Sequence, residues 1–433
     1  MAQPTLVTTS CSEGSGLTGA IGTSSNSMIA RVSRPCRILE EMSNVRSPRQ
    51  IHPFPARMAP ELALEALHRT RNGAIVLDPM CGSGTVLKLG VEEGWQAVGF
   101  DMDPLAVLLS RVACTRVNAD IALRAAERLA DQVTDRTRVR LPWIDDDLAT
   151  RDYVEFWFSE PQRSQLRQLA ALLANKRGPT SNLLRVALSR TIITKDRGAS
   201  LARDVSHSRP HRVRVENDYD VVKGFLSAAK DIGVLVDRPI TGNATVKRQD
   251  ARRLPASLDG TVDLVITSPP YLNAIDYMRG HKLSLVWLGF QIPELRDVRS
   301  KSVGAERAAD YDSNVARTLV PRHRKISSRQ QAMLDRYALD MYVFTAQIAR
   351  KLTPRGEAVI VVGDSIVQGA YVKNSLTVEK AAKMAGLKVV ERRSRRLPAS
   401  SRYLPPPAGD DGPLSKRMRS EVVLHFKRDL ART

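Results

Sequence analysis

The sequence predicts an α/β protein with a doubly wound, mostly parallel sheet and a largely helical, basic insertion. Short apolar segments alternate with amphipathic ones, which is typical of parallel strands connected by helices. This alternation stops after residue 114 and returns near residue 244. A glycine-rich turn follows the first apolar segment, where an open parallel sheet commonly binds its ligand. These observations define the expected fold and the place where it is interrupted.

The first half of the sheet is expected within residues 31–114, behind a tail over 1–30 that is rich in Ser, Thr and Gly. Leu and Ala at helical spacing behind a proline begin the pattern. Apolar segments that run into turns mark the strands. The expected order is helix, strand with its turn, helix, strand and helix, over 60–70, 74–85, 86–95, 97–104 and 105–117.

The second half of the sheet is expected within residues 241–433. The predicted strands are 244–255, 262–271, 356–365 and 420–428, and the predicted helices are 276–285, 331–352 and 376–386. The polar, basic stretch 296–330 receives no element. Between the two halves, residues 115–240 hold amphipathic stretches that predict a helical insertion.

The glycine-rich turn is Asp-Pro-Met-Cys-Gly-Ser-Gly-Thr, residues 78–85. Gly82 and Gly84 permit a close approach of the backbone to a ligand, and the following helix start offers free N–H groups. Asp101 ends the next strand, where a carboxylate can accept hydrogen bonds from ribose hydroxyls. The pattern is neither a dinucleotide fingerprint nor a P-loop, so a ligand with ribose and no phosphate, such as S-adenosylmethionine, fits best. A plain connecting turn is the alternative, which the register of Asp78 and Asp101 disfavours.

A second turn, Ser268-Pro269-Pro270-Tyr271, follows the apolar segment that begins at Val262. Prolines cannot donate to a sheet ladder, and they stiffen the exit of the strand. A fixed carbonyl and the Ser268 hydroxyl can accept hydrogen bonds from an exocyclic amine, and Tyr271 offers a flat face for stacking a base. The alternative is an ordinary turn that ends an edge strand, with Tyr271 in the core.

The chain carries 66 Lys and Arg against 46 Asp and Glu, a net charge of +20. This surplus favours a polyanionic partner such as nucleic acid, and a generally basic surface is the alternative. The segment 185–214 favours phosphate or groove contacts over a solvated helix face. The segments 322–325 and 392–396 either line a DNA cleft or face water.

No apolar run approaches the length that spans a bilayer, and no basic-then-apolar leader is found, so a cytoplasmic protein is expected. Cys11, Cys36, Cys81 and Cys114 lack the spacing of a metal site or a disulfide scaffold, so no metal is expected. Cys81 is interpreted as a packing residue. His52 is equally compatible with facing a ligand and with stabilising a turn.

Asp-Pro-Met-Cys-Gly-Ser-Gly-Thr followed by Thr-Ser-Pro-Pro-Tyr resembles the DNA amino-methyltransferases, which have a Rossmann-like sheet. These enzymes transfer a methyl group from S-adenosylmethionine to cytosine N4 or adenine N6. The first stretch resembles their cofactor motif and the second their catalytic motif. The stretch 52–62 resembles the element that surrounds the methionine end of their cofactor. The resemblance covers about 50–110 and 244–428, and it is specific because three motifs occur in order.

The resemblance implies a set of site residues. Cofactor binding is expected at Phe54, Asp78, Pro79, Cys81, Gly82, Gly84 and Thr85, at Asp101 for the ribose, and at Asp250 near the adenine ring. Catalytic residues are expected to be Ser268, Pro269, Pro270 and Tyr271. The target base would flip out of the duplex and receive the methyl group by direct displacement. Met80 departs from the aromatic residue that is most common in the family at its position.

The order of the motifs implies the domain plan. The cofactor part is 31–114, target recognition is expected in 115–240, and the catalytic part is 241–433. Double-stranded DNA is the implied partner, a separate restriction endonuclease is a further one, and a nucleoid-associated location in the cytoplasm follows. The motifs carry no information on oligomeric state.

The residue before the proline pair bears on the target base. In this family, Ser-Pro-Pro-Tyr is associated mainly with cytosine N4, and Asn or Asp at the first position mainly with adenine N6. A serine hydroxyl both donates and accepts, so it can serve either base; cytosine N4 is favoured and adenine N6 is the alternative. Carbon-5 methylation would need a cysteine nucleophile, for which Cys36 lies too far upstream. An RNA base methyltransferase and a non-catalytic DNA-binding protein are further alternatives.

Overall fold

A computed structural model describes residues 50–429, apart from the segments 55–56, 71–72, 135–138, 194–196, 204–209, 273–275, 305–312, 323–325, 368–369 and 398–419. The chain divides into two compact units, Met1–Pro48 and Arg49–Thr433, and the described residues belong to the second. The expected tail over 1–30 therefore lies outside the described residues, as do Cys11 and Cys36.

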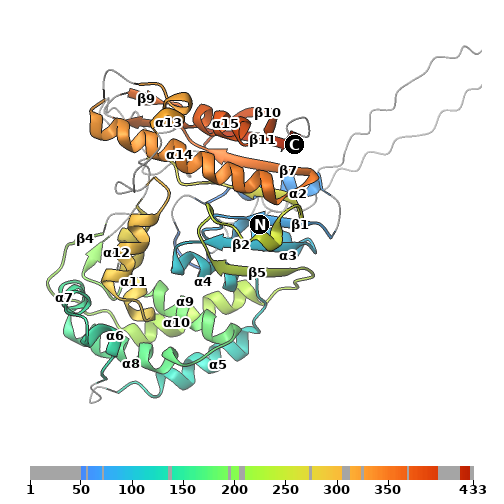
Figure 1. The fold of residues 1–433 in the computed structure, drawn as a ribbon. Helices are drawn as coiled ribbons and strands as arrows, with labels where there is room; N and C mark the ends of the chain where they lie inside the picture. The colour runs from blue at the N-terminus through green and yellow to red at the C-terminus, as the bar shows by residue number, and fades with distance from the viewer. Residues whose placement is uncertain are drawn as a thin grey trace, which may run out of the picture. The chain divides into compact units, whose positions relative to one another are not determined.

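The core is a seven-stranded sheet in the order β10-β11-β7-β6-β1-β2-β5 (Figure 1). Its strands are β1 (Ile75–Asp78), β2 (Gln96–Asp101), β5 (Asn243–Arg248), β6 (Val262–Thr267), β7 (Leu352–Val362), β10 (Leu387–Arg396) and β11 (Ser420–Arg428). The five strands from β5 to β7 are parallel, and β11 runs antiparallel to both β7 and β10. The predicted doubly wound, mostly parallel sheet is confirmed.

The direction of chain progression reverses between β1 and β6. From β1 the chain passes through β2 and β5 toward one edge, and it then returns to β6 and β7 toward the other. In an open parallel sheet, ligands bind beyond the carboxyl ends of the strands at such a switch point. Leu77 of β1 pairs with Val265 of β6. The turn after Asp78 therefore lies beside the turn after Thr267.

Helices cover both faces of the sheet because successive strand residues point to opposite sides. On the face of Val76 lie α2 (Pro60–His68), α3 (Thr85–Glu92) and α4 (Pro104–Ala113). On the face of Leu77 lie α14 (Ser328–Lys351) and α15 (Asn374–Met384). The helix starts are well specified; α14, for example, begins with a capping box formed by Ser327 and Gln330.

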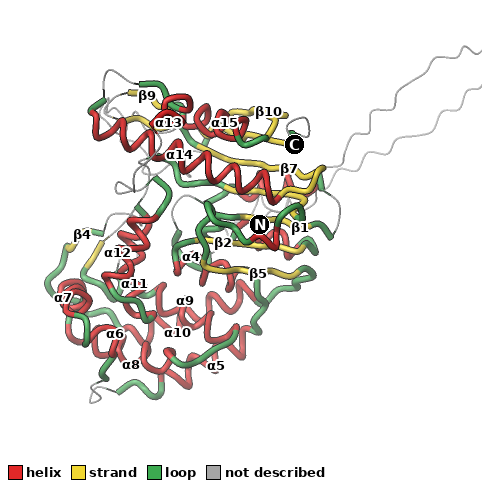
Figure 2. Tube along the Cα trace, viewed as in Figure 1, coloured by secondary structure: helices red, strands yellow, loops and turns green. Residues whose placement is uncertain are grey.

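The insertion is largely helical, as the sequence predicts, and Figure 2 shows this clearly. Its elements are α5 (Ala119–Ala130), α6 (Pro142–Asp145), α7 (Leu148–Trp157), α8 (Glu160–Ala174), α9 (Pro179–Arg190), the paired strands β3 (Ala202–Arg203) and β4 (His211–Arg212), and α10 (Val221–Val236). Its core also includes Leu283 of α11 (Tyr277–Leu285) and Leu295 of α12 (Ile292–Lys301). The helices that follow the second turn therefore pack into the insertion, beyond its expected end at residue 240.

Two stretches differ from the prediction. The sequence predicted no strand at 387–396, but β10 pairs with β11 there, because its partner is supplied by a segment distant along the chain. The stretch 296–330 received no element, yet it holds the end of α12 and the helix α13 (Ser313–Leu319). A small hairpin, β8 (Ser365–Val367) and β9 (Ala370–Val372), follows β7. Within the described residues, no helix is long and apolar enough to cross a membrane.

Candidate active site

The glycine-rich turn is held in place by β2 and α4. Gly84 has a φ of +80°, and a Cβ at this position would lie 2.8 Å from the Cα of Ser110 on α4. Glycine therefore satisfies both the left-handed backbone and the close approach. The N–H of Gly82 donates to the Asp101 carboxylate at 2.9 Å, and the Ser110 hydroxyl donates to the Gly82 carbonyl at 3.0 Å. The turn is thus held in shape by contacts within the protein.

Two acidic side chains of the expected cofactor site interact with each other, the buried Asp78 and the half-buried Asp101. Asp78 is 4% exposed and accepts a hydrogen bond from the N–H of Met80 at 3.2 Å. Burial raises the pKa of the Asp78 carboxyl to about 7, and the charge of Asp101 acts in the same direction. Burial and the charge of Asp103 raise the pKa of Asp101 to about 6. Ionising both carboxyl groups costs free energy, and a nearby positive charge or hydrogen-bond donor would lower this cost. The site therefore suits a ligand that supplies positive charge and hydrogen-bond donors.

Phe54 stands over the glycine-rich turn. A Cβ on Gly82 would come within 3.2 Å of the Phe54 ring, so the ring lies directly against the turn. Phe54 also stacks on Tyr277 of α11, with the ring centroids 5.5 Å apart. His52, just before it, contacts a neighbouring carbonyl with one ring nitrogen and the Ser189 hydroxyl at 2.9 Å with the other. Phe54 is thus brought to the expected cofactor site, while both ring nitrogens of His52 have partners within the protein.

Cys81, Pro79 and Thr85 complete the turn. The Cys81 sulfur accepts a hydrogen bond from Ser110 at 3.3 Å, and burial raises the pKa of its thiol above the ordinary value. A thiol that stays protonated is a poor nucleophile, in keeping with a packing role. Pro79 is buried, and Thr85 is the first residue of α3.

The second turn, residues 268–271, begins on the other side of the switch point. The Ser268 hydroxyl donates to the Tyr271 hydroxyl at 3.3 Å. Pro269 is buried and Pro270 is half-buried. The Tyr271 ring packs against the cluster between the sheet and α14, and burial and the charge of Glu421 raise the pKa of its hydroxyl. Ser268 and Tyr271 therefore meet, and stacking of a base on the tyrosine stays a prediction.

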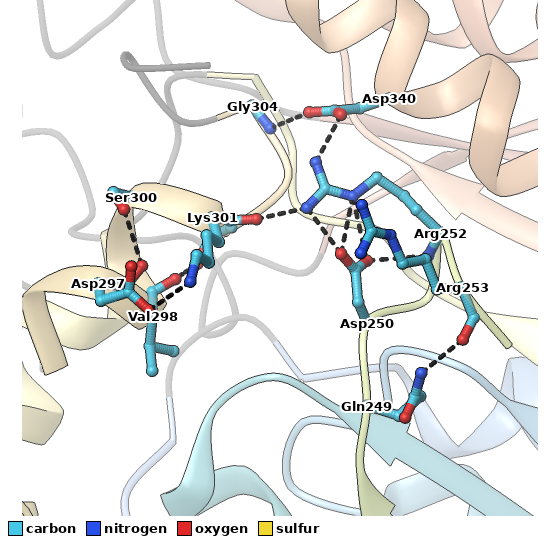
Figure 3. A network of polar contacts seen from close by, with 11 residues as sticks. Gln249, Asp250, Arg252, Arg253, Asp297, Val298, Ser300, Lys301, Gly304 and Asp340 are labelled. Carbon is cyan, nitrogen blue, oxygen red and sulfur yellow. Dashed lines mark hydrogen bonds and ion pairs between the residues drawn. The ribbon is translucent and has the colours of Figure 1, made fainter. Parts of the chain in front are cut away.

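Asp250 lies just beyond β5 and is engaged within the protein (Figure 3). Its carboxylate pairs with the Arg252 guanidinium at 2.8 Å, and Arg252 also reaches Asp340 of α14 at 2.6 Å. The preceding Gln249 donates its backbone N–H to the carbonyl of Asp101 at 3.0 Å, which keeps this loop at the end of β2. A contact from Asp250 to an adenine ring would share the carboxylate with Arg252.

Sequence reasoning missed a buried pair beside the cofactor turn, Asp103 and His281. The His281 Nδ1 contacts Asp103 Oδ2, while Asp103 Oδ1 accepts from the Leu105 N–H at 2.9 Å and caps α4. Burial opposes ionisation of Asp103, but the charge of His281 holds the pKa of this carboxyl below its usual range. The pair links α11, which follows the second turn, to the loop after Asp101.

The remaining nitrogen of His281 faces an apolar surrounding. His281 is 5% exposed, and its ring centroid lies 5.3 Å from that of Phe54. Its Nε2 has no hydrogen-bond partner among the described residues. The available sequence signal was the spacing of His281 with Met278 and Leu285, which marks the buried face of α11.

Several cations of the segment 185–214 serve the insertion itself. Arg185 donates to the carbonyl of Lys176 at 2.7 Å, near the end of α8. Arg190 pairs with Asp231 of α10 at 3.2 Å. These side chains connect helices of the insertion. Fewer cations of the segment are therefore free to contact a nucleic acid.

Three of the four arginines of 392–396 are also neutralised within the protein, and the fourth, Arg396, is exposed. The three lie on β10 and pair with carboxylates of α2, α15 and β11: Arg392 with Glu379 at 3.0 Å, Arg393 with Glu65 at 2.6 Å, and Arg395 with Glu61 at 2.8 Å and Glu421 at 3.4 Å. Of the segment 322–325, Arg322 is exposed and the rest lies outside the described residues.

No group of His, Cys, Asp and Glu that could hold a metal ion occurs in the part of the chain that the structure describes.

No family model matches the chain. Over 264 residues, or 56% of this chain, it is 26% identical to the type II methyltransferase M.MvaI from Kocuria varians, and it spans 58% of that relative's length. The type II methyltransferase M.BsoBI from Geobacillus stearothermophilus is 43% identical over 54 residues, 12% of this chain and 11% of its own. M.MjaII from Methanocaldococcus jannaschii is 34% identical over 76 residues, 17% of this chain and 14% of its own.

Among solved structures, a TehB-like SAM-dependent methyltransferase from Corynebacterium glutamicum is 11% identical, with a TM-score of 0.28 over 85% of this chain and 86% of its own. A geranyl diphosphate methyltransferase in complex with SAM is 8% identical, with a TM-score of 0.32 over 85% of this chain and 84% of its own. The fold defines a doubly wound α/β protein, and the two turns form a candidate ligand site at its switch point. Along part of its length, the chain is similar to type II methyltransferases, and it spans 58% of the length of M.MvaI.

Proposed function

We propose that the protein is a DNA methyltransferase that uses S-adenosylmethionine to methylate the exocyclic N4 of cytosine in duplex DNA. One observation carries this proposal above the others. The turn after Asp78 and the turn after Thr267 are distant in sequence, yet they follow neighbouring strands at the switch point of the sheet. The names of the relatives, type II methyltransferases, support DNA as the substrate.

The residues around the first turn fit S-adenosylmethionine better than a phosphate-bearing nucleotide. Asp78 and Asp101 would repel a phosphate, whereas they suit a sulfonium cation and ribose hydroxyls. Asp101 would accept from the ribose, the backbone around Gly82 would lie against the cofactor, and Phe54 would cover it. When bound, the cofactor supplies an electrophilic methyl group.

The second turn would position the base. The Ser268 hydroxyl and the carbonyl of Pro269 would accept hydrogen bonds from the exocyclic amine and fix its orientation. Such positioning contributes up to about 7–11 kcal/mol in model reactions, so no strong base is required. The amine nitrogen would form its new bond to the methyl carbon as the bond from that carbon to the sulfonium sulfur breaks, which leaves a neutral thioether, and the nitrogen would then lose its proton to solvent. Recognition of the target sequence by residues 115–240, a separate restriction endonuclease and a nucleoid-associated location stay predictions.

The methylated nucleoside that the protein produces identifies its target base. The protein would be expressed in a host that lacks DNA methylation, and the digested DNA would be examined by nucleoside mass spectrometry. We expect N4-methyldeoxycytidine. N6-methyldeoxyadenosine would move the activity to adenine, and modified nucleosides found in RNA alone would contradict a DNA substrate.

A substitution of Ser268 tests the proposal that this residue takes part in catalysis. We expect Ser268→Ala to lower the methylation rate by about 100- to 1,000-fold, as the loss of one oriented polar group commonly does, while cofactor affinity measured by calorimetry is unchanged. Ser227→Ala, on the exposed surface of α10, is the matched control and should behave as the wild type. Normal methylation by Ser268→Ala would show that the assignment is wrong.

A further inference from the structure

A cluster of cations lies on the outer side of α11 and α12, and we call it the α11–α12 cationic face. It consists of Arg279, Lys282, Arg296 and Arg299. The three arginines are exposed, and Lys282 is half-buried with its ammonium 5.8 Å from the centre of the Tyr153 ring. These side chains come from two helices that pack together in the core of the insertion.

The cations of this face are left largely without counter-charges. Asp276 is shared by Arg299 at 2.8 Å and Arg279 at 3.4 Å. Within the part of the chain that the structure describes, neither Lys282 nor Arg296 forms an ion pair. The two acids of α12 are committed elsewhere, because Glu294 pairs with Arg248 and Asp297 with Lys301.

The three arginines of the face place like charges around Lys282. Burial lowers the pKa of its ammonium, and the charges of Arg299, Arg296 and Arg279 lower it further, against the opposing effect of Asp276. A fold that keeps like charges together loses stability unless a ligand neutralises them. Three arginines of β10 differ, since Arg392, Arg393 and Arg395 each have a carboxylate partner.

The contacts on the inner side of α11 hold the α11–α12 cationic face close to the candidate active site. His281 neighbours Lys282 in sequence but points the other way, to the buried Asp103 next to Asp101. Tyr277, at the start of α11, stacks on Phe54 over the glycine-rich turn. A polyanion on the outer side of α11 would therefore lie one helix away from the cofactor turn.

From this placement we propose that the α11–α12 cationic face binds the phosphate backbone of the substrate duplex. The inference rests on the proposed function for the identity of the polyanion. It assigns backbone contacts to 277–301, outside the expected recognition region 115–240 and outside the basic segment 392–396. Cations that lie side by side on a surface can neutralise successive phosphates and release their counterions, which gives affinity that depends on salt and not on sequence.

The test is the salt dependence of duplex binding by Lys282→Gln/Arg296→Gln. Among the described residues neither side chain forms an ion pair, so the change removes repulsion at the cost of the contact between Lys282 and the Tyr153 ring, and the melting temperature should stay close to that of the wild type. Binding of a labelled duplex would be followed by fluorescence anisotropy from about 50 to 300 mM NaCl. We expect the slope of log K against log [salt] to become shallower by about 0.9 for each lost phosphate contact, or about 1.8 in total.

Arg392→Gln/Arg393→Gln is the matched control, because it removes the same charge from β10. Its slope should equal that of the wild type, and an unchanged slope for Lys282→Gln/Arg296→Gln would overturn the inference. A slope change with duplex RNA but not with duplex DNA would overturn the choice of partner. The proposed function is tested separately: a wild type that binds duplex through this face without methylating it would refute the activity and leave the surface intact.

Discussion

At the carboxyl ends of β1 and β2, the acidic side chains already accept hydrogen bonds from backbone N–H groups: Asp78 from Met80, Asp101 from Gly82 and Asp103 from Leu105. Beyond β6, by contrast, the Ser268 hydroxyl donates to another side-chain hydroxyl, that of Tyr271, at 3.3 Å. One half of the candidate site is organised by the backbone, and the other half by two side chains.

This difference separates two tasks. A cofactor site that is shaped by its own backbone can bind without the second substrate, because little reorganisation is left to be done. Hydroxyl groups that satisfy each other can exchange partners when an amine arrives, since both donate and accept. We therefore expect the cofactor half to be preformed and the base half to be completed by the target nucleotide. The predictions below probe this contrast, from the largest effect to the smallest.

The largest effect is expected from the buried acid of the preformed half. The folded-state pKa of Asp78 is raised from 3.8 to about 7, so the folded protein binds this proton more tightly than the unfolded chain. Its stabilising contribution is complete below about pH 4 and is lost as the pH rises to about 7, at about 1.4 kcal/mol per pH unit. Asp78→Asn has no carboxyl group at this position, so its stability does not fall in this way. Between about pH 4 and 7, the unfolding free energy of the variant relative to that of the wild type should rise by up to about 4 kcal/mol, as measured by denaturation. If the difference in unfolding free energy did not depend on pH, a buried, protonated Asp78 would be contradicted.

A smaller effect is expected at the pair that joins the two halves. His281→Ala leaves the buried Asp103 carboxylate without its side-chain partner, which should cost about 2–3 kcal/mol of unfolding free energy. His281→Gln keeps an N–H donor and should recover part of the loss. Because α11 would be released from the cofactor loop, the KM for S-adenosylmethionine should rise more than kcat falls. If the alanine variant and the wild type had equal unfolding free energies, the contact between His281 and Asp103 would make no contribution to stability.

The smallest effect is a pH dependence of cofactor affinity. The pKa of Asp101 is raised to about 6, and its protonated form is a weaker acceptor for ribose hydroxyls. Affinity should therefore be constant above about pH 7 and fall by up to tenfold per pH unit below about pH 6, since each unit changes the ionised fraction tenfold. Calorimetry with Asp101→Asn should show weaker binding without this decline. A wild-type profile as flat as that of the variant would remove Asp101 from the binding site.

The cofactor half was predictable because its residues share one turn and the end of the next strand. Phe54 was predictable through the resemblance, although its contact with Gly82 was not. His281 and Asp103 are 178 residues apart, and neither stands in a recognised motif. Their pairing depends on how α11 docks, which local patterns do not encode.

Charge was the least predictable property. The arginines of β10 stood out in the sequence, but Arg395 pairs with Glu61 from a segment 334 residues away and Arg393 with Glu65 from one 328 residues away. The cations of α11 and α12 are sparser along the chain, yet the fold gathers them with few acids. A high density of basic residues along the sequence is therefore a poor guide to a binding surface. Whether tertiary packing places carboxylates beside those residues is a better guide.

The most direct test of the preformed half is a calorimetric titration of S-adenosylmethionine into the full-length protein without DNA. The proposed site predicts saturable binding at one site per chain, and loss of that binding in Asp78→Ala, with Ser268→Ala binding as the wild type does. Absence of binding by the wild type, or binding that Asp78→Ala retains in full, would contradict a preformed cofactor site at the switch point of the sheet.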